Sequence, residues 1–218
     1  MMPRRRRLNS WCYDVTTFPV FLTDKRSGNP VAAELIDVIS EADLRAVEAE
    51  WKPVTNARIR ELMSRGIRPA DWPEGWHWKW RDKVQQITGL LAFQTFALRC
   101  EGKLQGLMQL KTAGAICRVP EQAGKDLVYI DYVETAPWNR RAIVDSPRLG
   151  GVGTIMIRAA IEVSRDQEFR GRIGLHSLPS AERFYAEACG MTDLGLDGTY
   201  EGLRYFEMTS VQADAFSG

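Results

Sequence analysis

The sequence predicts an α/β (α+β) domain built on a mixed sheet with helices on both faces. Three observations support this fold class. Segments rich in β-branched and aromatic residues alternate with segments of helical periodicity along the chain. Residues 96–110 have the pattern of an antiparallel hairpin. Residues 127–136 are apolar on both faces, which is typical of a central strand covered on both sides.

The N-terminal part is expected to supply an added strand or a packed arm. Residues 8–24 mix aromatic and β-branched side chains, as strands do. Residues 25–30 have the composition of a turn, and residues 31–39 are predicted to be a strand. We therefore divide the chain into an N-terminal extension with a basic arm, residues 1–30, and one domain, residues 31–218.

Two short helices are predicted after this strand. Ser40 is a good N-cap with Asp43 close behind it, and apolar residues follow at helical spacing. Pro53 is expected to end the first helix because proline has no N–H to donate. Thr55 is expected to cap the second helix, and Gly66 to end it.

Residues 69–80 combine proline and glycine with several tryptophans, which predicts a loop with a large apolar surface. Two interpretations stay open for this Trp-rich loop. It is either a lid over the core or a wall of a pocket for an acceptor molecule. Its tryptophans are Trp72, Trp76, Trp78 and Trp80.

The remaining elements complete the sheet and its covering helices. The hairpin strands 96–100 and 104–110 precede the central strand 127–136. Residues 152–169 have close to ideal helical periodicity. A strand at 172–178 leads into a helix from Pro179 to about Gly190, and short strands at 194–196 and 203–208 follow.

Composition excludes several classes of protein. Hydrophobic residues make up 44% of the 218 residues, which argues against disorder, and no run approaches the ~20 apolar residues of a membrane span. The net charge of +1 gives no support for a nucleic-acid binder, although the run Arg4–Arg7 is open to phosphate or membrane contact as well as to solvent. Four widely spaced cysteines and two histidines argue against a structural zinc site and indicate reduced thiols and a cytoplasmic location.

A glycine-rich segment at the start of the helix 152–169 carries the clearest chemical signal. Free N–H groups at a helix start attract anions, and glycine lets the backbone approach a ligand closely. The segment lacks the Gly-Lys-Ser/Thr triplet of a P-loop, and Met156 stands where a Rossmann fingerprint needs its third glycine. A phosphate or pyrophosphate site of another kind is therefore expected here.

The pattern Arg148-x-x-Gly151-x-Gly153 resembles the pyrophosphate loop of the GNAT (GCN5-related) N-acetyltransferase superfamily. The later helix, with Phe184-Tyr185 before Gly190-Met191, is similar to the second signature of that family. The resemblance covers roughly residues 31–209. It implies a mixed, mostly antiparallel central sheet with helices on both faces, the GNAT-like acyl-CoA N-acyltransferase fold. It also implies acetyl-CoA as co-substrate and transfer of its acetyl group to a primary amine by direct attack, with no metal.

Two departures from the family pattern affect the site. Residues 138–147 lengthen the link between the central strand and the glycine loop, and Arg140 and Arg141 in it are interpreted as part of a flexible charged loop. The asparagine common at the start of the tyrosine helix is missing, because Pro179-Ser180 stands there.

The resemblance also implies site residues. Tyr185 matches the tyrosine that protonates the departing thiolate, with a purely structural aromatic as the alternative. For the base that accepts the amine proton, Glu134 is the first choice, and Asp131 and His176 are alternatives. His176 is also open to a purely structural role, and a chain of water molecules with no single base stays open as well. The acyl carrier is expected to contact Val133, Thr135, Arg148, Gly150, Gly151, Val152, Gly153 and Thr154.

Two other functions stay open beside the enzyme. One is a catalytically inactive GNAT-like module that binds CoA or regulates a partner. The other is a regulatory protein whose Arg4–Arg7 arm docks on nucleic acid, a partner that the charge balance makes unlikely. The acceptor of the enzyme is a small-molecule or peptide amine, no membrane partner is expected, and a homodimer is left open.

Overall fold

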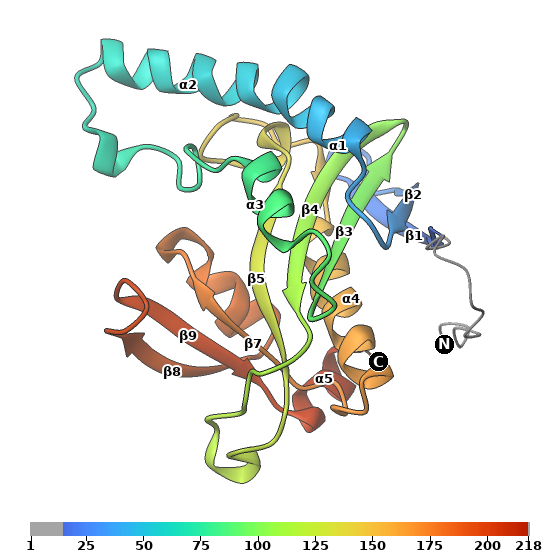
Figure 1. Ribbon diagram of the computed structural model, residues 1–218. Helices are drawn as coiled ribbons and strands as arrows, with labels where there is room; N and C mark the ends of the chain where they lie inside the picture. The colour runs from blue at the N-terminus through green and yellow to red at the C-terminus, as the bar shows by residue number, and fades with distance from the viewer. Residues whose placement is uncertain (1–14, 218) are drawn as a thin grey trace.

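The computed structural model describes residues 15–217, and one nine-stranded sheet lies at the centre of this part of the chain (Figure 1). The strand order is β6-β1-β2-β3-β4-β5-β7-β9-β8. In the described sheet all neighbours are antiparallel except β5 and β7, which are parallel. The strands are β1 Thr17–Asp24, β2 Pro30–Ile36, β3 Phe93–Cys100, β4 Lys103–Lys111, β5 Val128–Thr135, β6 Leu149–Gly150, β7 Ile173–Ser177, β8 Thr192–Asp197 and β9 Leu203–Met208.

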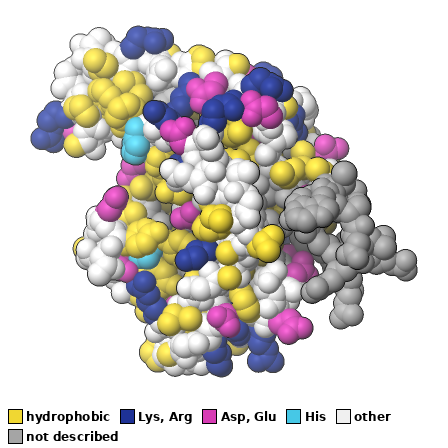
Figure 2. All heavy atoms as spheres, in the orientation of Figure 1, with side chains coloured by type: hydrophobic (Ala, Val, Ile, Leu, Met, Phe, Trp, Pro, Cys, Tyr) yellow, Lys and Arg dark blue, Asp and Glu magenta, His cyan; other side chains and the backbone are white. Residues whose placement is uncertain are grey.

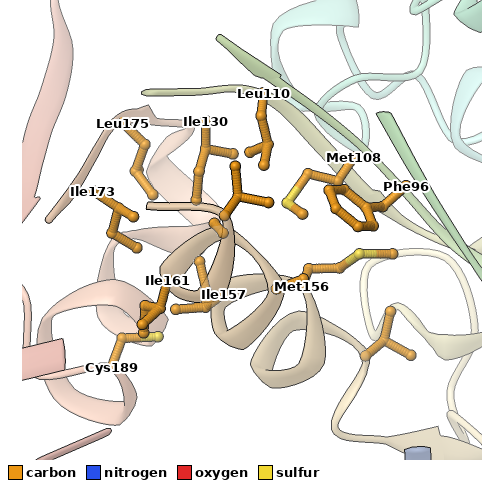
Figure 3. Packing of buried hydrophobic residues seen from close by; sticks show 14 of the residues in the cluster. Phe96, Met108, Leu110, Ile130, Met156, Ile157, Ile161, Ile173, Leu175 and Cys189 are labelled. Atoms are coloured by element: carbon orange, nitrogen blue, oxygen red, sulfur yellow. The ribbon is translucent and has the colours of Figure 1, made fainter. Parts of the chain in front are cut away.

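Helices cover both faces of the sheet, so the predicted fold class is confirmed. On one face, α4 packs its apolar side onto β3, β4, β5 and β7, which forms the larger core (Figure 3). On the other face, Trp51 and Trp80 pack with Leu104 and Leu107 in a second core. The helices are α1 Glu41–Ala46, α2 Lys52–Ser64, α3 Trp80–Ile87, α4 Val152–Asp166 and α5 Ser210–Ser217, with π-helical turns at Val47–Trp51 and Phe184–Ala188.

The predicted strands are present with small shifts at their ends. Strand β1 falls within the region 8–24 and pairs with both β2 and β6, so this segment is a strand of the main sheet. The hairpin β3–β4 turns at Glu101 and Gly102, both with positive φ, as right-handed strand twist requires of a two-residue turn. Residues 1–14, including Arg4–Arg7 and Cys12, lie outside the described residues.

The predicted boundary between the first two helices is wrong. Ser40 caps α1 as expected, but α1, the π-helical turn and α2 run on without a break from residue 41 to 64. The N–H of Lys52 donates to the carbonyl of Val47, and Pro53 follows directly. The wider π-helical turn makes room for the proline ring, so the helix continues through it. Thr55 is therefore buried inside α2 and caps nothing.

Two helices were not predicted from the sequence. Helix α3 begins at Trp80, inside the segment interpreted as loop, and it has no side-chain N-cap to mark its start. Helix α5 does carry a start signal. The backbone N–H of Thr209 donates to Gln212 Oε1, and the N–H of Gln212 donates to Thr209 Oγ1, a reciprocal capping box.

Candidate active site

The candidate site lies where β5 and β7 separate. The two strands pair only from Val128–Ile130 against Ile173–Leu175. Strand β5 then continues to Thr135, and in Figure 1 β7 and β9 turn away from it. The edge of β5 that faced β7 is therefore left without a strand partner beyond Ile130. Unpaired backbone groups at such an edge are free to bind an extended ligand.

Two cavities share a wall at this separation. The glycine-loop cavity, of about 420 Å³, is lined by residues 149–153 and by the free end of β5. The aromatic cavity, of about 690 Å³, is lined by Trp78, Tyr129, Tyr132, Tyr200 and the ring of His176. Figure 2 shows a hollow on this face in which hydrophobic side chains lie beside charged ones. The residues that line both cavities are Trp78, Val133, Leu178, Ala181 and Tyr185.

The glycines at the start of α4 have separate physical reasons. Gly151 is the N-cap with a φ of 91°, a left-handed conformation that glycine adopts without strain. A Cβ on Gly153 would lie 3.0 Å from the ring of Phe184, so this glycine lets the helix start pack on that ring. The N–H groups of the first turn of α4 have no acceptor within the helix and favour an anion in the glycine-loop cavity.

The predicted contacts of the acyl carrier divide into two groups. Six of them, Val133, Thr135, Gly150, Gly151, Val152 and Gly153, line the glycine-loop cavity. Arg148 and Thr154 are not among its lining residues.

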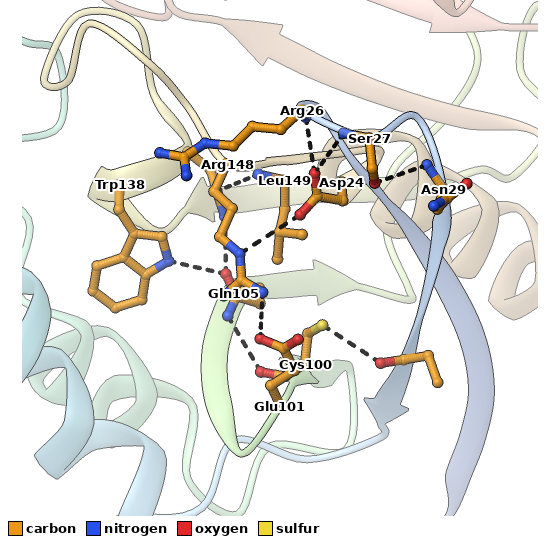
Figure 4. Close-up of polar contacts among 12 residues, drawn as sticks. Asp24, Arg26, Ser27, Asn29, Cys100, Glu101, Gln105, Trp138, Arg148 and Leu149 are labelled. Carbon is orange, nitrogen blue, oxygen red and sulfur yellow. Dashed lines mark hydrogen bonds and ion pairs between the residues drawn. The ribbon is translucent and has the colours of Figure 1, made fainter.

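Arg148 points toward the β3–β4 turn (Figure 4). Its Nη2 lies 2.6 Å from Glu101 Oε2, and its Nε lies 3.9 Å from Asp24 Oδ2. The side chain is about half exposed, and its carbonyl accepts the N–H of Lys25. In this structure Arg148 therefore links the segment 148–151 to the end of β1 and to the β3–β4 turn.

Two other cations do line the glycine-loop cavity, Lys25 and Arg140. The interpretation of Arg140 as part of a flexible loop is wrong. Its Nη2 donates to the carbonyl of Glu74 at 2.6 Å, and its Nη1 lies 3.4 Å from Glu134 Oε1. The extended link is held as well, because Asn139 is buried and accepts the N–H of Leu149.

Glu134 lines the glycine-loop cavity, and protein groups hold its carboxyl group. Its Oε2 accepts a hydrogen bond of 2.6 Å from Trp80 Nε1. Burial raises the pKa of Glu134, while the Trp80 hydrogen bond and the charges of Arg140, Lys52 and Lys83 act in the opposite direction. A carboxylate with a raised pKa is a better proton acceptor than an exposed one.

Tyr185 has one side in the core and one side in the cavities. Its ring packs against Phe184 and Phe206 at centroid distances of 5.3 and 5.9 Å. It is buried, yet it lines both cavities. Among the described residues no group forms a hydrogen bond with its hydroxyl, and burial raises its pKa. The core role and a proton-donor role are therefore compatible in one side chain.

Asp131 is the extra residue of a β-bulge. Strand β4 pairs Gln109 with Tyr132 and Leu110 with Ile130, so Asp131 has no partner in the ladder. Its Oδ2 accepts a 2.7 Å hydrogen bond from Gln109 Nε2. The bulge breaks the regular alternation, and it places Asp131 in the aromatic cavity, whereas Glu134 lines the glycine-loop cavity. Burial raises the pKa of Asp131.

His176 lines the aromatic cavity, and both of its ring nitrogens are bound. Its Nδ1 lies 2.7 Å from the hydroxyl of Tyr129, and its Nε2 lies 3.0 Å from Asp197 Oδ2. Its ring stacks on Tyr200 at 3.9 Å and 6°. Burial lowers the pKa of His176, although the carboxylate of Asp197 opposes this.

Helix α3, which the sequence did not reveal, brings a lysine into the aromatic cavity. Lys83 Nζ lies 3.1 Å from the centroid of the Tyr132 ring and 4.8 Å from that of Trp78. Burial lowers the pKa of Lys83 to about 8, against the charges of Asp131 and Glu134. One turn earlier in the helix, Trp80 holds Glu134.

Sequence reasoning missed several residues of the site because their partners are distant in the chain. Tyr129 and Asp197 meet His176 across separations of 47 and 21 residues. Trp80 meets Glu134 across 54 residues. Only the strand order brings these groups together, so no local spacing signals them. The signal that was available is the type of residue, namely ionisable groups on otherwise apolar strands.

Comparison with known proteins identifies the fold. No family model and no curated protein matches the chain. An N-acyl amino acid synthase from uncultured soil microbes superposes with a TM-score of 0.50 at 11% identity, over 85% of this chain and 95% of that one. An aminoglycoside acetyltransferase in complex with coenzyme A and kanamycin gives 0.50 at 17% identity, over 85% and 99%. The likeness at these identities is one of fold, and the chain has the predicted GNAT fold.

Two other kinds of site are absent from the described residues. Among residues 15–217, no helix is both long and apolar enough to cross a membrane. In the same range, no three histidine, cysteine, aspartate or glutamate side chains are grouped so that they could hold a metal ion.

Proposed function

We propose that this protein is an acyl-CoA-dependent N-acyltransferase that transfers an acetyl group from acetyl-CoA to a primary amine. The observation that carries the proposal is the separation of β5 from β7 between two cavities. A carrier bound in the glycine-loop cavity and an amine bound in the aromatic cavity would meet at the shared wall, which contains Val133 and Tyr185.

The glycine-loop cavity suits the diphosphate and the extended arm of an acyl carrier. The start of α4 offers free N–H groups, and Lys25 and Arg140 add positive charge. Beyond Ile130 the free edge of β5, near Val133 and Thr135, offers backbone groups for β-augmentation. These residues would hold the carrier without a metal.

The chemistry requires a neutral amine and a proton for the departing sulfur. An alkyl amine has a pKa near ~10, so a base must take its proton before or during attack. Glu134, Asp131 and His176 are the candidates for that base. Tyr185 is the candidate acid, because burial raises its pKa and the residue lines both cavities.

A cytoplasmic location is part of the proposal. Cys100, Cys117 and Cys189 are free and buried, which fits a reducing compartment. For the acceptor we propose a small-molecule or peptide amine.

Two measurements test this function. Acetyl-CoA at 100 times its dissociation constant should stabilise the protein by about 2.7 kcal/mol, a melting shift of about 5–11 °C for a chain of this size. Release of CoA thiol in the presence of a panel of amines then separates a catalyst from an inactive CoA-binding module. The absence of any shift would exclude both.

A pair of lysine variants locates the carrier. Lys25→Ala should weaken acetyl-CoA binding by about 3- to 30-fold, because a cation beside the bound phosphates is lost. Lys125→Ala, at an exposed lysine that lines neither cavity, is the matched control. Equal affinity of the two variants would place the diphosphate elsewhere.

A further inference from the structure

Three side chains from three strands form a continuous hydrogen-bonded chain in the wall of the aromatic cavity. Tyr129 on β5 contacts His176 on β7, and His176 contacts Asp197 at the end of β8. Ionised Asp197 can only accept a hydrogen bond, so Nε2 of His176 carries the proton. Nδ1 is then an acceptor, and the hydroxyl of Tyr129 donates to it. The ionised carboxylate of Asp197 therefore fixes which group donates in each of the two hydrogen bonds.

The surroundings hold this chain in place. Asp197 Oδ2 is bound by Arg118 Nη1 at 2.6 Å, and its Oδ1 accepts from the N–H and the hydroxyl of Thr199 at 2.9 and 2.6 Å. These hydrogen bonds lower the pKa of Asp197, so it stays ionised. The imidazole is stacked on Tyr200 and packs against Tyr205 at 4.8 Å. An aspartate, a histidine and a hydroxyl in this order form an arrangement suited to accepting a proton.

Of the two alternative bases, Asp131 lines the aromatic cavity beside this chain, with its Oδ2 bound by Gln109 Nε2, whereas Glu134 does not line it. Glu134 lines the glycine-loop cavity, and its carboxyl group is bound by Trp80 and lies near Arg140. It is not among the residues that line the aromatic cavity. Tyr129 and His176 do line that cavity, at the point where β5 and β7 begin to separate. The aromatic cavity is therefore lined by Tyr129 and His176 and not by Glu134.

We propose, resting on the proposed acyl transfer, that Tyr129 takes the proton of the acceptor amine and passes its own hydroxyl proton to His176. Tyr129 is then the catalytic residue, His176 stores the proton, and Asp197 is a positioning residue. Bond changes balance as follows. An ammonium acceptor first loses one proton to solvent. The nitrogen of the neutral amine then bonds to the acyl carbon, the carbon–sulfur bond breaks, and one proton of that nitrogen moves to the Tyr129 oxygen while the Tyr129 proton moves to Nδ1. The thiolate takes a proton from Tyr185, and exchange with solvent restores both groups.

The kinetic test uses Tyr129→Phe, His176→Gln and their double variant. Each single variant should lower kcat/KM for thiol release about 10²-fold or more, and the double variant should fall no further, because the two groups act as one unit. Acetyl-CoA binding, read from the melting shift, should change less than about twofold. The control is Tyr205→Phe, since Tyr205 touches the His176 ring but donates to Glu207, and it should keep wild-type kcat/KM.

The pH profile separates this chain from a carboxylate base. The acidic limb of kcat/KM should disappear in His176→Gln. The opposite result, with the limb and about 10²-fold of rate lost in Glu134→Gln while Tyr129→Phe stays within threefold of wild type, would overturn the proposal. The charged and titratable groups that face the imidazole are Tyr129, Asp197, Tyr200, Tyr205 and Arg118.

A measurement without turnover keeps the two proposals distinguishable. The chain contains two histidines, so nitrogen NMR of the wild type and of His77→Gln assigns His176 directly. At pH 7 the ring should be neutral with its proton on Nε2, and Tyr129→Phe should shift the Nδ1 resonance. A proton on Nδ1, or a charged ring, would overturn the relay even if the protein acylates amines. A wild type that binds acetyl-CoA and releases no thiol with any amine would instead overturn the proposed function.

Discussion

Tyr185 is the residue whose removal gives the cleanest test of a catalytic role. Among the described residues nothing is hydrogen-bonded to its hydroxyl, so Tyr185→Phe leaves no partner unsatisfied. We expect the unfolding free energy to change by less than about 0.5 kcal/mol. We expect kcat for thiol release to fall about 10²-fold, with KM for the amine little changed. Urea unfolding and steady-state kinetics measure both quantities.

The contrary result is equally informative. A variant that keeps wild-type kcat would show that the Tyr185 ring serves the core alone, through its contacts with Phe184 and Phe206.

The raised pKa of Glu134 predicts that the free energy of unfolding depends on pH. Burial raises its pKa in the folded protein above the usual 4.5. The stability it contributes is therefore complete below its usual pKa and is lost as the pH rises through the raised value. Glu134→Gln does not titrate and can still accept from Trp80, so its stability relative to wild type should increase with pH above about 4.5. Urea unfolding at pH 4, 6 and 8 checks this. A difference that is constant with pH would contradict it.

At the residue scale, the sequence identified which residues belong to the candidate site better than it identified the groups that they contact. Gly151 and Gly153 stood out as glycines that let the backbone approach a ligand, but Gly153 is required by the ring of Phe184. His176 was identified as an ionisable residue on an apolar strand. Its partners Tyr129 and Asp197 could not be identified from the sequence, because only the order of strands in the sheet brings them next to His176. The chemical type of a side chain can be read from the sequence, whereas the groups that surround it depend on the fold.

At the scale of single elements, the start of α1 offers a test of local stability. The N–H of Asp43 donates to Ser40 Oγ, and the N–H of Ser40 donates to Asp43 Oδ2. Ser40→Ala should cost about 1 kcal/mol of unfolding free energy, the usual loss of an N-cap. Asp43→Asn should cost more, because Asp43 is buried and also pairs with Arg99 on β3 at 2.7 Å. Urea unfolding of both variants gives the order, and a reversed order would contradict the role of Arg99.

Elements were predictable where they carry a local signal. The box of Ser40 and Asp43 marked α1, and the positive φ of Gly66 ends α2 as expected. The end of the first helix was not predictable, because a π-helical turn absorbs Pro53 and that turn has no sequence signature. Helix α3 was missed because Trp80 and Val84 face a core that only the assembled sheet provides.

At the scale of the whole molecule, function depends on an interruption in the sheet. Alternation and hairpin patterns predicted the strands, and the resemblance implied a mixed, mostly antiparallel sheet. The parallel pairing stops at Ile130 and Asp131 is a bulge, in a sheet that α4 covers on one face and α3 on the other. Local patterns therefore predicted the strands, whereas no local pattern marks the residue at which β5 and β7 separate.

Within residues 15–217, the residues that line the two cavities lie between Lys25 and Leu203, and we expect the N-terminal arm to be dispensable for ligand binding. A variant that lacks residues 1–14 should keep the melting shift of the full chain with acetyl-CoA, within about 1 °C, and should keep its kcat/KM. The same variant should lose any salt-sensitive binding to nucleic acid, because Arg4–Arg7 go with the deleted residues. A smaller acetyl-CoA shift would mean that the arm contributes to the carrier site. In that case the diphosphate is held by more than the start of α4, Lys25 and Arg140.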